Sequence, residues 1–299
     1  MRAFLVCTAI LVLIGRARVA DAQLQDLGHR LPAGAGVDAG TQAAQGLYVA
    51  DRVVWFASND VHDRDGEEVP LAGFDLDTFA NVIGIAGTLK LGPVYASAAI
   101  AVPVVDLSIS IDDPRASVDR LGLGDIYFEP LKLGSRSTHL DVVASYSLYA
   151  PTDENATTGI GRPQWSHQLA AGGTVFFDDH RGWRLSALAS YLTNGKKRGI
   201  DITRGDTLLI QGGFAVPVQP WLDAGVAGYA LWQLTDDRGA DLPDVLRGAR
   251  ERAFGLGPEI GVTIEALRSR VTARVTWDID GKTRPVGTIV IVGIAYLVM

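Results

Sequence analysis

Hydrophobic and polar residues alternate along much of this chain in segments of about ten residues. The alternation is clearest in residues 140–149, 254–265 and 270–278. In the last of these, valine, alanine and tryptophan occupy one parity, whereas arginine, threonine and aspartate occupy the other. Successive side chains of a β-strand point to opposite faces of its sheet. Each such segment therefore predicts a strand with one apolar face and one polar face.

The gaps between these segments alternate between short and long. The short gaps are residues 91–94, 134–138, 178–182, 217–220 and 268–269. The long, polar gaps are residues 57–75, 107–122, 150–167, 193–206, 235–252 and 280–287. Tight turns at one end and longer loops at the other are typical of a bacterial outer-membrane β-barrel. The rival architecture, a secreted soluble β-sandwich, has no reason to sort its loops by length.

We therefore predict an all-β fold, a single antiparallel transmembrane β-barrel of about 12 strands over residues 46–299. The expected strands begin near Gly46, Leu76, Val94, Leu123, His139, Gln168, Trp183, Thr207, Trp221, Ala253, Arg270 and Thr288. An even number of strands places both termini on the side of the short turns, which is the periplasmic side in such barrels. Aromatic residues next to the gaps are expected in the two interfacial belts. They are Trp183, Trp221, Trp55, Tyr149, Tyr191 and Trp232.

Residues 1–22 have the features of a signal peptide. A positive start is followed by an apolar run from Ala3 to Gly15, and Ala20-Asp21-Ala22 has the pattern of a cleavage site. The run is too short for a membrane-spanning helix, which needs about 17–25 residues. Cys7 is the only cysteine and lies in this leader, so the exported chain is expected to contain no disulfide. Residues 23–45 are glycine-rich and are predicted to lie either in the periplasm or in the lumen as a plug.

The charge balance excludes one class of partner. The chain carries a net charge of −7, and because the leader holds three arginines and one aspartate, the remainder carries −9. A nucleic-acid-binding protein needs a basic face, so no nucleic acid is expected as a partner. The five histidines are scattered among loops and termini, which predicts neither a metal site nor a cofactor. The acidic stretch 60–75 is interpreted as a solvated surface rather than a cation site.

Charged and tyrosine residues at the inward parity are the candidates for a solute path. Glu259 and Arg274 are expected on adjacent strands, where they could face each other. Such pairs either brace the polar inner wall or form a constriction on a path for small molecules. Tyr127 and Tyr229 share this parity and offer aromatic contact to an apolar solute. The full set of lumen candidates is Asp125, Tyr127, Glu129, Tyr229, Glu259 and Arg274.

Two other functions remain as alternatives. Some outer-membrane barrels are lipid hydrolases, which need a serine and a histidine within hydrogen-bond distance. Ser166 and His167 are adjacent, but consecutive strand residues point to opposite faces, so no catalytic residue and no enzyme activity is predicted. A structural or adhesin-like barrel is the other alternative.

Several short motifs resemble one protein family. Gly122-Leu123-Gly124-Asp125 is followed by Pro130, and Gly228-Tyr229 leads to the polar run Gln233–Asp237. Further matches, in order along the chain, are Tyr146, Pro151-Thr152, Gly161, Trp165, Trp183, Asn194 and Gly255-Leu256-Gly257-Pro258. From Gly46 to the C-terminus the chain resembles the outer-membrane transporters called MetA-pathway of phenol degradation or SphA-like proteins. It departs from their pattern at Asp153, where the family tends to have glycine.

The resemblance implies a transporter for small, hydrophobic or aromatic molecules, working by passive uptake in the bacterial outer membrane. The partners expected are outer-membrane lipids, the small-molecule solute and the barrel-assembly machinery. The last strand matches the C-terminal recognition pattern in Gly293, Tyr296 and Val298, although the chain ends in Met299 rather than phenylalanine or tryptophan.

Overall fold

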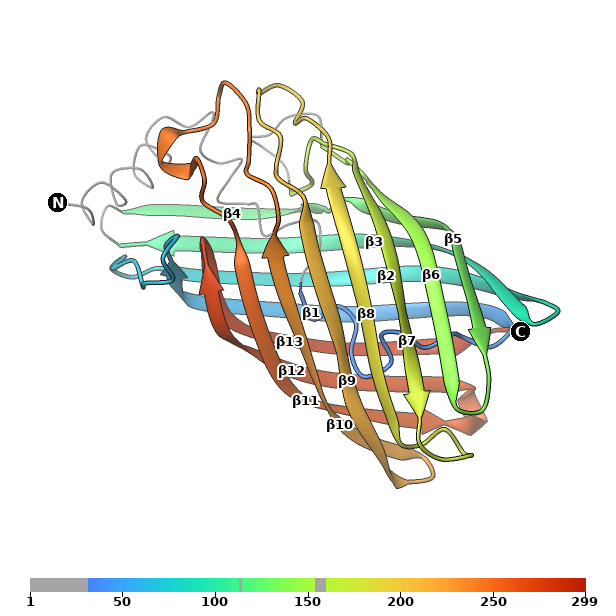
Figure 1. Ribbon diagram of the computed structural model, residues 1–299. Coiled ribbons are helices and arrows are strands. Elements are labelled where there is room, and N and C mark those ends of the chain that lie inside the picture. The colour runs from blue at the N-terminus through green and yellow to red at the C-terminus, as the bar shows by residue number, and fades with distance from the viewer. Residues whose placement is uncertain (1–31, 113–114, 154–159) are drawn as a thin grey trace.

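The computed structural model describes residues 32–112, 115–153 and 160–299. The predicted leader, residues 1–22, lies outside the described residues. The described chain forms one antiparallel sheet that closes into a barrel of strongly tilted strands (Figure 1). The ring closes through the pairing of β2 (Asp75–Leu91) with β3 (Val94–Ile111), and such closure satisfies the backbone groups of a sheet in lipid. Among the described strands, β4 (Ala116–Leu123) pairs on one side only, with β3.

The strands follow the alternating segments of the sequence. Their bounds are β1 Gly46–His62, β2 Asp75–Leu91, β3 Val94–Ile111, β4 Ala116–Leu123, β5 Ile126–Arg136, β6 Leu140–Ala150, β7 Ser166–Phe176, β8 Arg184–Asn194, β9 Thr207–Gln219, β10 Leu222–Gln233, β11 Arg252–Ile264, β12 Ser269–Lys282 and β13 Arg284–Leu297. Two 3₁₀ turns, Asp244–Leu246 and Glu265–Leu267, lie in connections. In the described part of the chain, no helix is long and apolar enough to cross a membrane.

Strands β4 and β5 share one position in the barrel wall. Residues 104–111 of β3 pair with β4, whereas residues 94–101 of β3 pair with β5. The two strands are separated only at Gly124 and Asp125. The thirteen strands therefore fill twelve positions around the wall, and the predicted barrel of about 12 strands is confirmed.

The barrel has a short-turn end and a long-loop end. At the short-turn end, the first and last strands meet, where the Leu47 amide donates to the Met299 carbonyl (2.9 Å). Two expected long loops are largely strand instead. Residues 112–115 alone separate β3 from β4, and Thr283 alone separates β12 from β13. Backbone pairing continues through these polar stretches because ladder hydrogen bonds do not depend on apolar side chains.

The outer wall is apolar and exposed. Each of the following outer side chains is between 48% and 61% exposed: Ile83, Ile85, Leu169, Leu185, Val226, Leu256 and Ile260. So large an apolar surface matches a lipid bilayer rather than water. Trp183, Trp221 and Tyr191 are exposed near the strand ends, as belt residues are expected to be. Trp55 is also exposed, but it lies near the middle of β1. Tyr149 was also expected in a belt, but it is buried on the inner face of β6.

Candidate functional site: the barrel lumen

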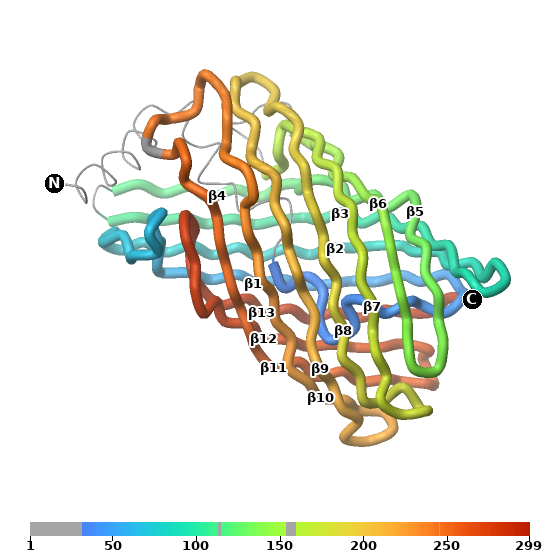
Figure 2. Tube along the Cα trace, in the orientation of Figure 1, coloured from blue at the N-terminus to red at the C-terminus, as the bar shows by residue number. Residues whose placement is uncertain are grey.

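Residues 32–42, which precede β1, lie inside the barrel (Figure 2). Its backbone amides donate to inward side chains of distant strands: Ala35 to Gln211 (2.9 Å), Val37 to Glu259 (3.1 Å) and Gly40 to Ser186 (2.7 Å). The amide of Gln42 donates to Asp141 (3.0 Å), and Arg52 donates to the Gly34 carbonyl (2.7 Å). Residues 32–42, which we call the lumenal segment, are thus bonded to strands on all sides of the wall.

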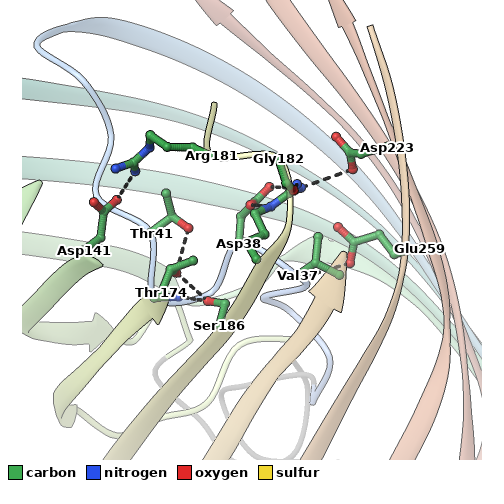
Figure 3. Close-up of polar contacts among 12 residues, drawn as sticks. Val37, Asp38, Thr41, Asp141, Thr174, Arg181, Gly182, Ser186, Asp223 and Glu259 are labelled. Carbon is green, nitrogen blue, oxygen red and sulfur yellow. Dashed lines mark hydrogen bonds and ion pairs between the residues drawn. The ribbon is translucent and has the colours of Figure 1, made fainter. Parts of the chain in front are cut away.

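Ion pairs hold the lumenal segment at the level of Asp38 (Figure 3). Asp38 binds Arg184 of β8 (2.6 Å) and Arg270 of β12 (3.3 Å). Both arginines also bind Asp223 of β10, at 3.2 and 2.8 Å. Two carboxylates and two guanidinium groups therefore neutralise one another between the segment and three strands. A pair of unlike charges in such partly desolvated surroundings is held more strongly than one at a protein surface.

Glu259 and Arg274 form a buried pair beside this cluster. They are register partners on β11 and β12, and their side chains meet at 2.6 Å. Glu259 also accepts the Val37 amide, so the pair is bonded to the lumenal segment. A methyl group on Gly36 would lie 1.9 Å from the Glu259 carboxylate and closer still to Arg274. Only glycine at this position lets the segment pass so close to the pair.

An arginine from the short-turn end is linked, through Asp141, to the C-terminal end of the lumenal segment at Gln42. Arg181, in the turn between β7 and β8, binds the buried carboxylate of Asp141 (2.6 Å), which also accepts the Gln42 amide. The Arg181 guanidinium stacks on the Phe176 ring, 3.8 Å from its centroid. Figure 3 shows Arg181 and Asp141 pointing toward each other beside the segment.

Toward the long-loop end, the lumen is apolar. We call this region the apolar lumen layer. Its buried strand members are Val54, Phe56, Leu76, Leu107, Ile111, Leu209, Tyr229, Leu231, Ala253, Ile289 and Ile291. Ala33 of the lumenal segment and Phe74 of the β1–β2 loop pack in the same cluster. The lumenal segment therefore contributes to the layer on its short-turn side, and the β1–β2 loop contributes on its long-loop side.

A buried network of charged side chains lies beside this layer, next to the long loops. Arg204 and Arg284 both bind Glu251, the second pair at 3.1 Å, and Arg284 lies 3.8 Å from Asp278. Tyr229 donates its hydroxyl proton to Asp278. These groups tie loop residues to β10, β12 and β13.

The predicted lumen candidates fall in three places. Glu259 and Arg274 lie beside the lumenal segment, and Tyr229 joins the apolar lumen layer to Asp278. Tyr127 and Glu129 lie on the inner face of β5, with the Tyr127 hydroxyl 3.0 Å from the Glu129 carboxylate. Asp125 lies between β4 and β5, where its carboxylate accepts the Arg162 amide (2.9 Å) of the β6–β7 loop.

The sequence did not predict the apolar lumen layer or the two arginines that pair with Asp38, Arg184 and Arg270. Phe56 and Ile289 are fully buried, but their segments are apolar on both faces, so parity could not identify the inner one. Arg184 lies at the start of a strand, and no local pattern separates it from a surface arginine.

The residues considered for chemistry are separated by the wall. Ser166 faces inward and donates to Asn194 (2.7 Å), whereas the His167 ring meets the Tyr146 hydroxyl on the outer face (2.7 Å). Among residues 32–112, 115–153 and 160–299, no three His, Cys, Asp or Glu side chains come together to hold a metal ion.

Comparisons with known proteins agree with this architecture. The solved COG4313 outer membrane channel from Pseudomonas putida F1 is similar, with a TM-score of 0.73, 12% identity, and coverage of 86% of this chain and 97% of that one. The transport unit of the autotransporter AIDA-I from Escherichia coli has a TM-score of 0.56 and 10% identity, covering 95% of this chain and 98% of that one. These likenesses show the fold, which is that of outer-membrane barrels. No curated protein sequence matches.

A family model described as "Putative MetA-pathway of phenol degradation" matches residues 58–292, most of the chain. The resemblance seen in the sequence motifs is thereby confirmed: the chain belongs to this family.

Proposed function

We propose that the protein is an outer-membrane channel that takes up small hydrophobic or aromatic molecules by passive diffusion. The observation that carries this proposal is the apolar lumen layer. A barrel that conducts water-soluble solutes has a polar interior. Here thirteen buried apolar side chains face one another inside the wall instead. The free energy of an apolar solute falls when it leaves water for such a site, whereas that of an ion or a sugar does not.

Family membership and the likeness to an outer membrane channel support the same reading. In this proposal the long-loop end faces the cell exterior, and the C-terminus lies in the periplasm, as short turns do in known barrels. The N-terminus, which the sequence also predicts to be periplasmic, lies outside the described residues. The lumenal segment is then a plug that separates the apolar lumen layer from the periplasm. Transport requires the segment to shift, because its contacts reach both sides of the wall.

Uptake by cells tests the proposal. Cells with and without the protein are given a panel of radiolabelled aromatic and aliphatic solutes, with a sugar of similar size as the polar comparison. We expect faster uptake of the apolar solutes only in cells that carry the protein. An unchanged rate across the panel would remove the transport function.

Adjacent residues of β13 supply a matched pair of variants. Ile289 is buried in the apolar lumen layer, whereas Val290 has the opposite, outward parity. Ile289→Thr adds a hydroxyl to the layer and is expected to slow apolar uptake severalfold. Val290→Thr makes a similar change on the outer wall and is expected to leave uptake unchanged.

A further inference from the structure

Three positively charged side chains at the short-turn end of the lumen form no ion pair with any acid in the described part of the chain. We call them the cationic mouth; they are Lys90 of β2 and Lys132 and Arg136 of β5. Lys90 and Arg136 are exposed, and Lys132 is half-buried. Their charges are therefore open to a solute that enters the lumen from this end.

The strand alternation places the two lysines on the inner face of the wall. Lys90 has the parity of Thr88, whose hydroxyl lies 2.9 Å from that of Ser97 on β3. Lys132 is the register partner of Ser97. Ser97 accepts a hydrogen bond from the side chain of Gln42 in the lumenal segment (3.3 Å). Both lysines therefore lie on the face that carries the lumenal segment.

Aromatic side chains lie beside the other two parts of the cationic mouth. The Lys90 ammonium lies 5.8 Å from the centroid of the Tyr95 ring, its register partner on β3. Arg136 has the inward parity of Lys132 on the same strand, and it interacts electrostatically with Tyr48 of β1. A tyrosine ring or hydroxyl leaves the positive charge of its neighbour in place, whereas a carboxylate would cancel it.

The acids of this part of the lumen do not neutralise the cationic mouth. Four of them form ion pairs with arginines: Asp38 with Arg184, Asp141 with Arg181, Asp223 with Arg270, and Glu259 with Arg274. Glu129 remains; it accepts a hydrogen bond from Tyr127, and it and Asp141 interact electrostatically with Lys132. Three cations against this one unpaired carboxylate leave an excess of two positive charges, in a chain whose net charge is −7.

Unpaired cations in a narrow lumen favour anions over cations. Strands β2 and β5 flank β3 at the short-turn end, and neighbouring strands lie about 4.8 Å apart, so the two strands are separated by about 10 Å. The screening length at physiological salt is about 8 Å, so the fields of the three charges overlap. Low-dielectric walls concentrate such a field, and lysine and arginine side chains that line a pore give it a preference for anions.

From this arrangement we infer that the cationic mouth binds small anions and makes the ion current through the lumen anion-selective. Anions collect among Lys90, Lys132 and Arg136, whereas cations are repelled from the same space. The inference goes beyond the uptake of apolar solutes, because it concerns charged solutes and needs no contribution from the apolar lumen layer.

The permeability ratio of chloride to potassium tests the inference directly. The purified full-length protein is inserted into planar bilayers that separate two potassium chloride solutions of different concentration, and the reversal potential gives the ratio. We expect chloride to be the more permeant ion in the wild-type protein. Lys90→Glu and Lys132→Glu should each lower the ratio severalfold, because each replaces a positive charge with a negative one. Lys90→Gln and Lys132→Gln remove only one charge and should lower it by less.

Arg198→Glu is the control, because it changes the net charge equally but is exposed in the β8–β9 loop at the long-loop end. Its ratio is expected to match that of the wild-type protein, and heat-modifiable gel migration shows that each variant is folded. A wild-type protein that carries no ion current or prefers potassium would overturn the inference. So would an unchanged ratio in the folded lysine variants, or an equal shift in Arg198→Glu. Anion selectivity without uptake of apolar solutes by cells would support the inference and refute the proposed transport function, and the reverse result would refute the inference alone.

Discussion

At the scale of single residues, Gly40 sets how closely the lumenal segment lies against the wall. A methyl group at this position would lie 2.3 Å from the Gly173 carbonyl oxygen, and the other near atoms also belong to the Gly173 backbone. That backbone is held in the β7 ladder and has little freedom to yield. We expect Gly40→Ala to displace the segment and to raise single-channel ion conductance in planar bilayers severalfold. Gly87→Ala is the control, because nothing lies within 4 Å of the added methyl group. Folded Gly40→Ala protein with unchanged conductance would contradict the assignment of the segment as a plug.

The alternation of residues along a strand predicted correctly that some side chains point into the lumen, but it did not do so for others. On β11 and β12 the alternation is regular, so the sequence predicts that Glu259 and Arg274 face each other, and they are register partners in the structure. The same alternation on β6 places Tyr149 inward with Asp141 and Ser147, but its position beside a long gap led to the belt interpretation. Asp125 lies at the interruption between β4 and β5, where parity no longer determines direction.

At the scale of elements, the β7–β8 turn depends on one carboxylate. Asp178 accepts the Trp183 and Gly182 amides (both 2.8 Å), and these hydrogen bonds, Trp183 first, lower the pKa of the Asp178 carboxyl below its ordinary value. A lowered pKa in the folded state means that the stabilising contribution is complete above the ordinary value of about 3.9 and is lost as the pH falls through the folded-state pKa. The turn should therefore loosen only in acid below pH about 4. NMR titration of the Trp183 amide shift measures this, and Asp178→Asn should abolish the titration. A midpoint at or above 3.9 would contradict the prediction.

Strand identity was easier to predict from sequence than strand length. The apolar parity of each wall segment is imposed by lipid and is therefore visible in the residue pattern. Beyond the bilayer that constraint disappears, and β3, β4, β12 and β13 continue through polar residues that resemble loops. Backbone pairing and polar side-chain contacts hold these extensions, such as Ser108 with Asp119 and Arg284 with Glu251, and backbone pairing has no side-chain signature.

At the scale of the whole molecule, the closed wall could be predicted but the filling of its lumen could not. The count of twelve positions follows from the rhythm of short and long gaps. The apolar lumen layer gathers residues from β1, β2, β3, β9, β10, β11 and β13, which are separated by up to most of the chain. The path of the lumenal segment depends on contacts such as Asp38 with Arg270, 232 residues apart. Contacts over such separations leave no periodicity within one segment.

The apolar outer wall predicts how the molecule responds to a charge placed on it. Val226 lies near the middle of β10 on the outer face and is 48% exposed. In a water-soluble protein, Val226→Arg at so exposed a position would change the free energy of unfolding by no more than about 0.5 kcal/mol. In a bilayer the arginine must be removed from water near the midplane, which costs about 2–4 kcal/mol. We expect the larger loss, measured by reversible urea unfolding in lipid vesicles, and no comparable loss for Glu67→Arg in the β1–β2 loop. A change of about 0.5 kcal/mol or less at Val226 would mean that this surface does not face lipid, and the channel function would fail with it.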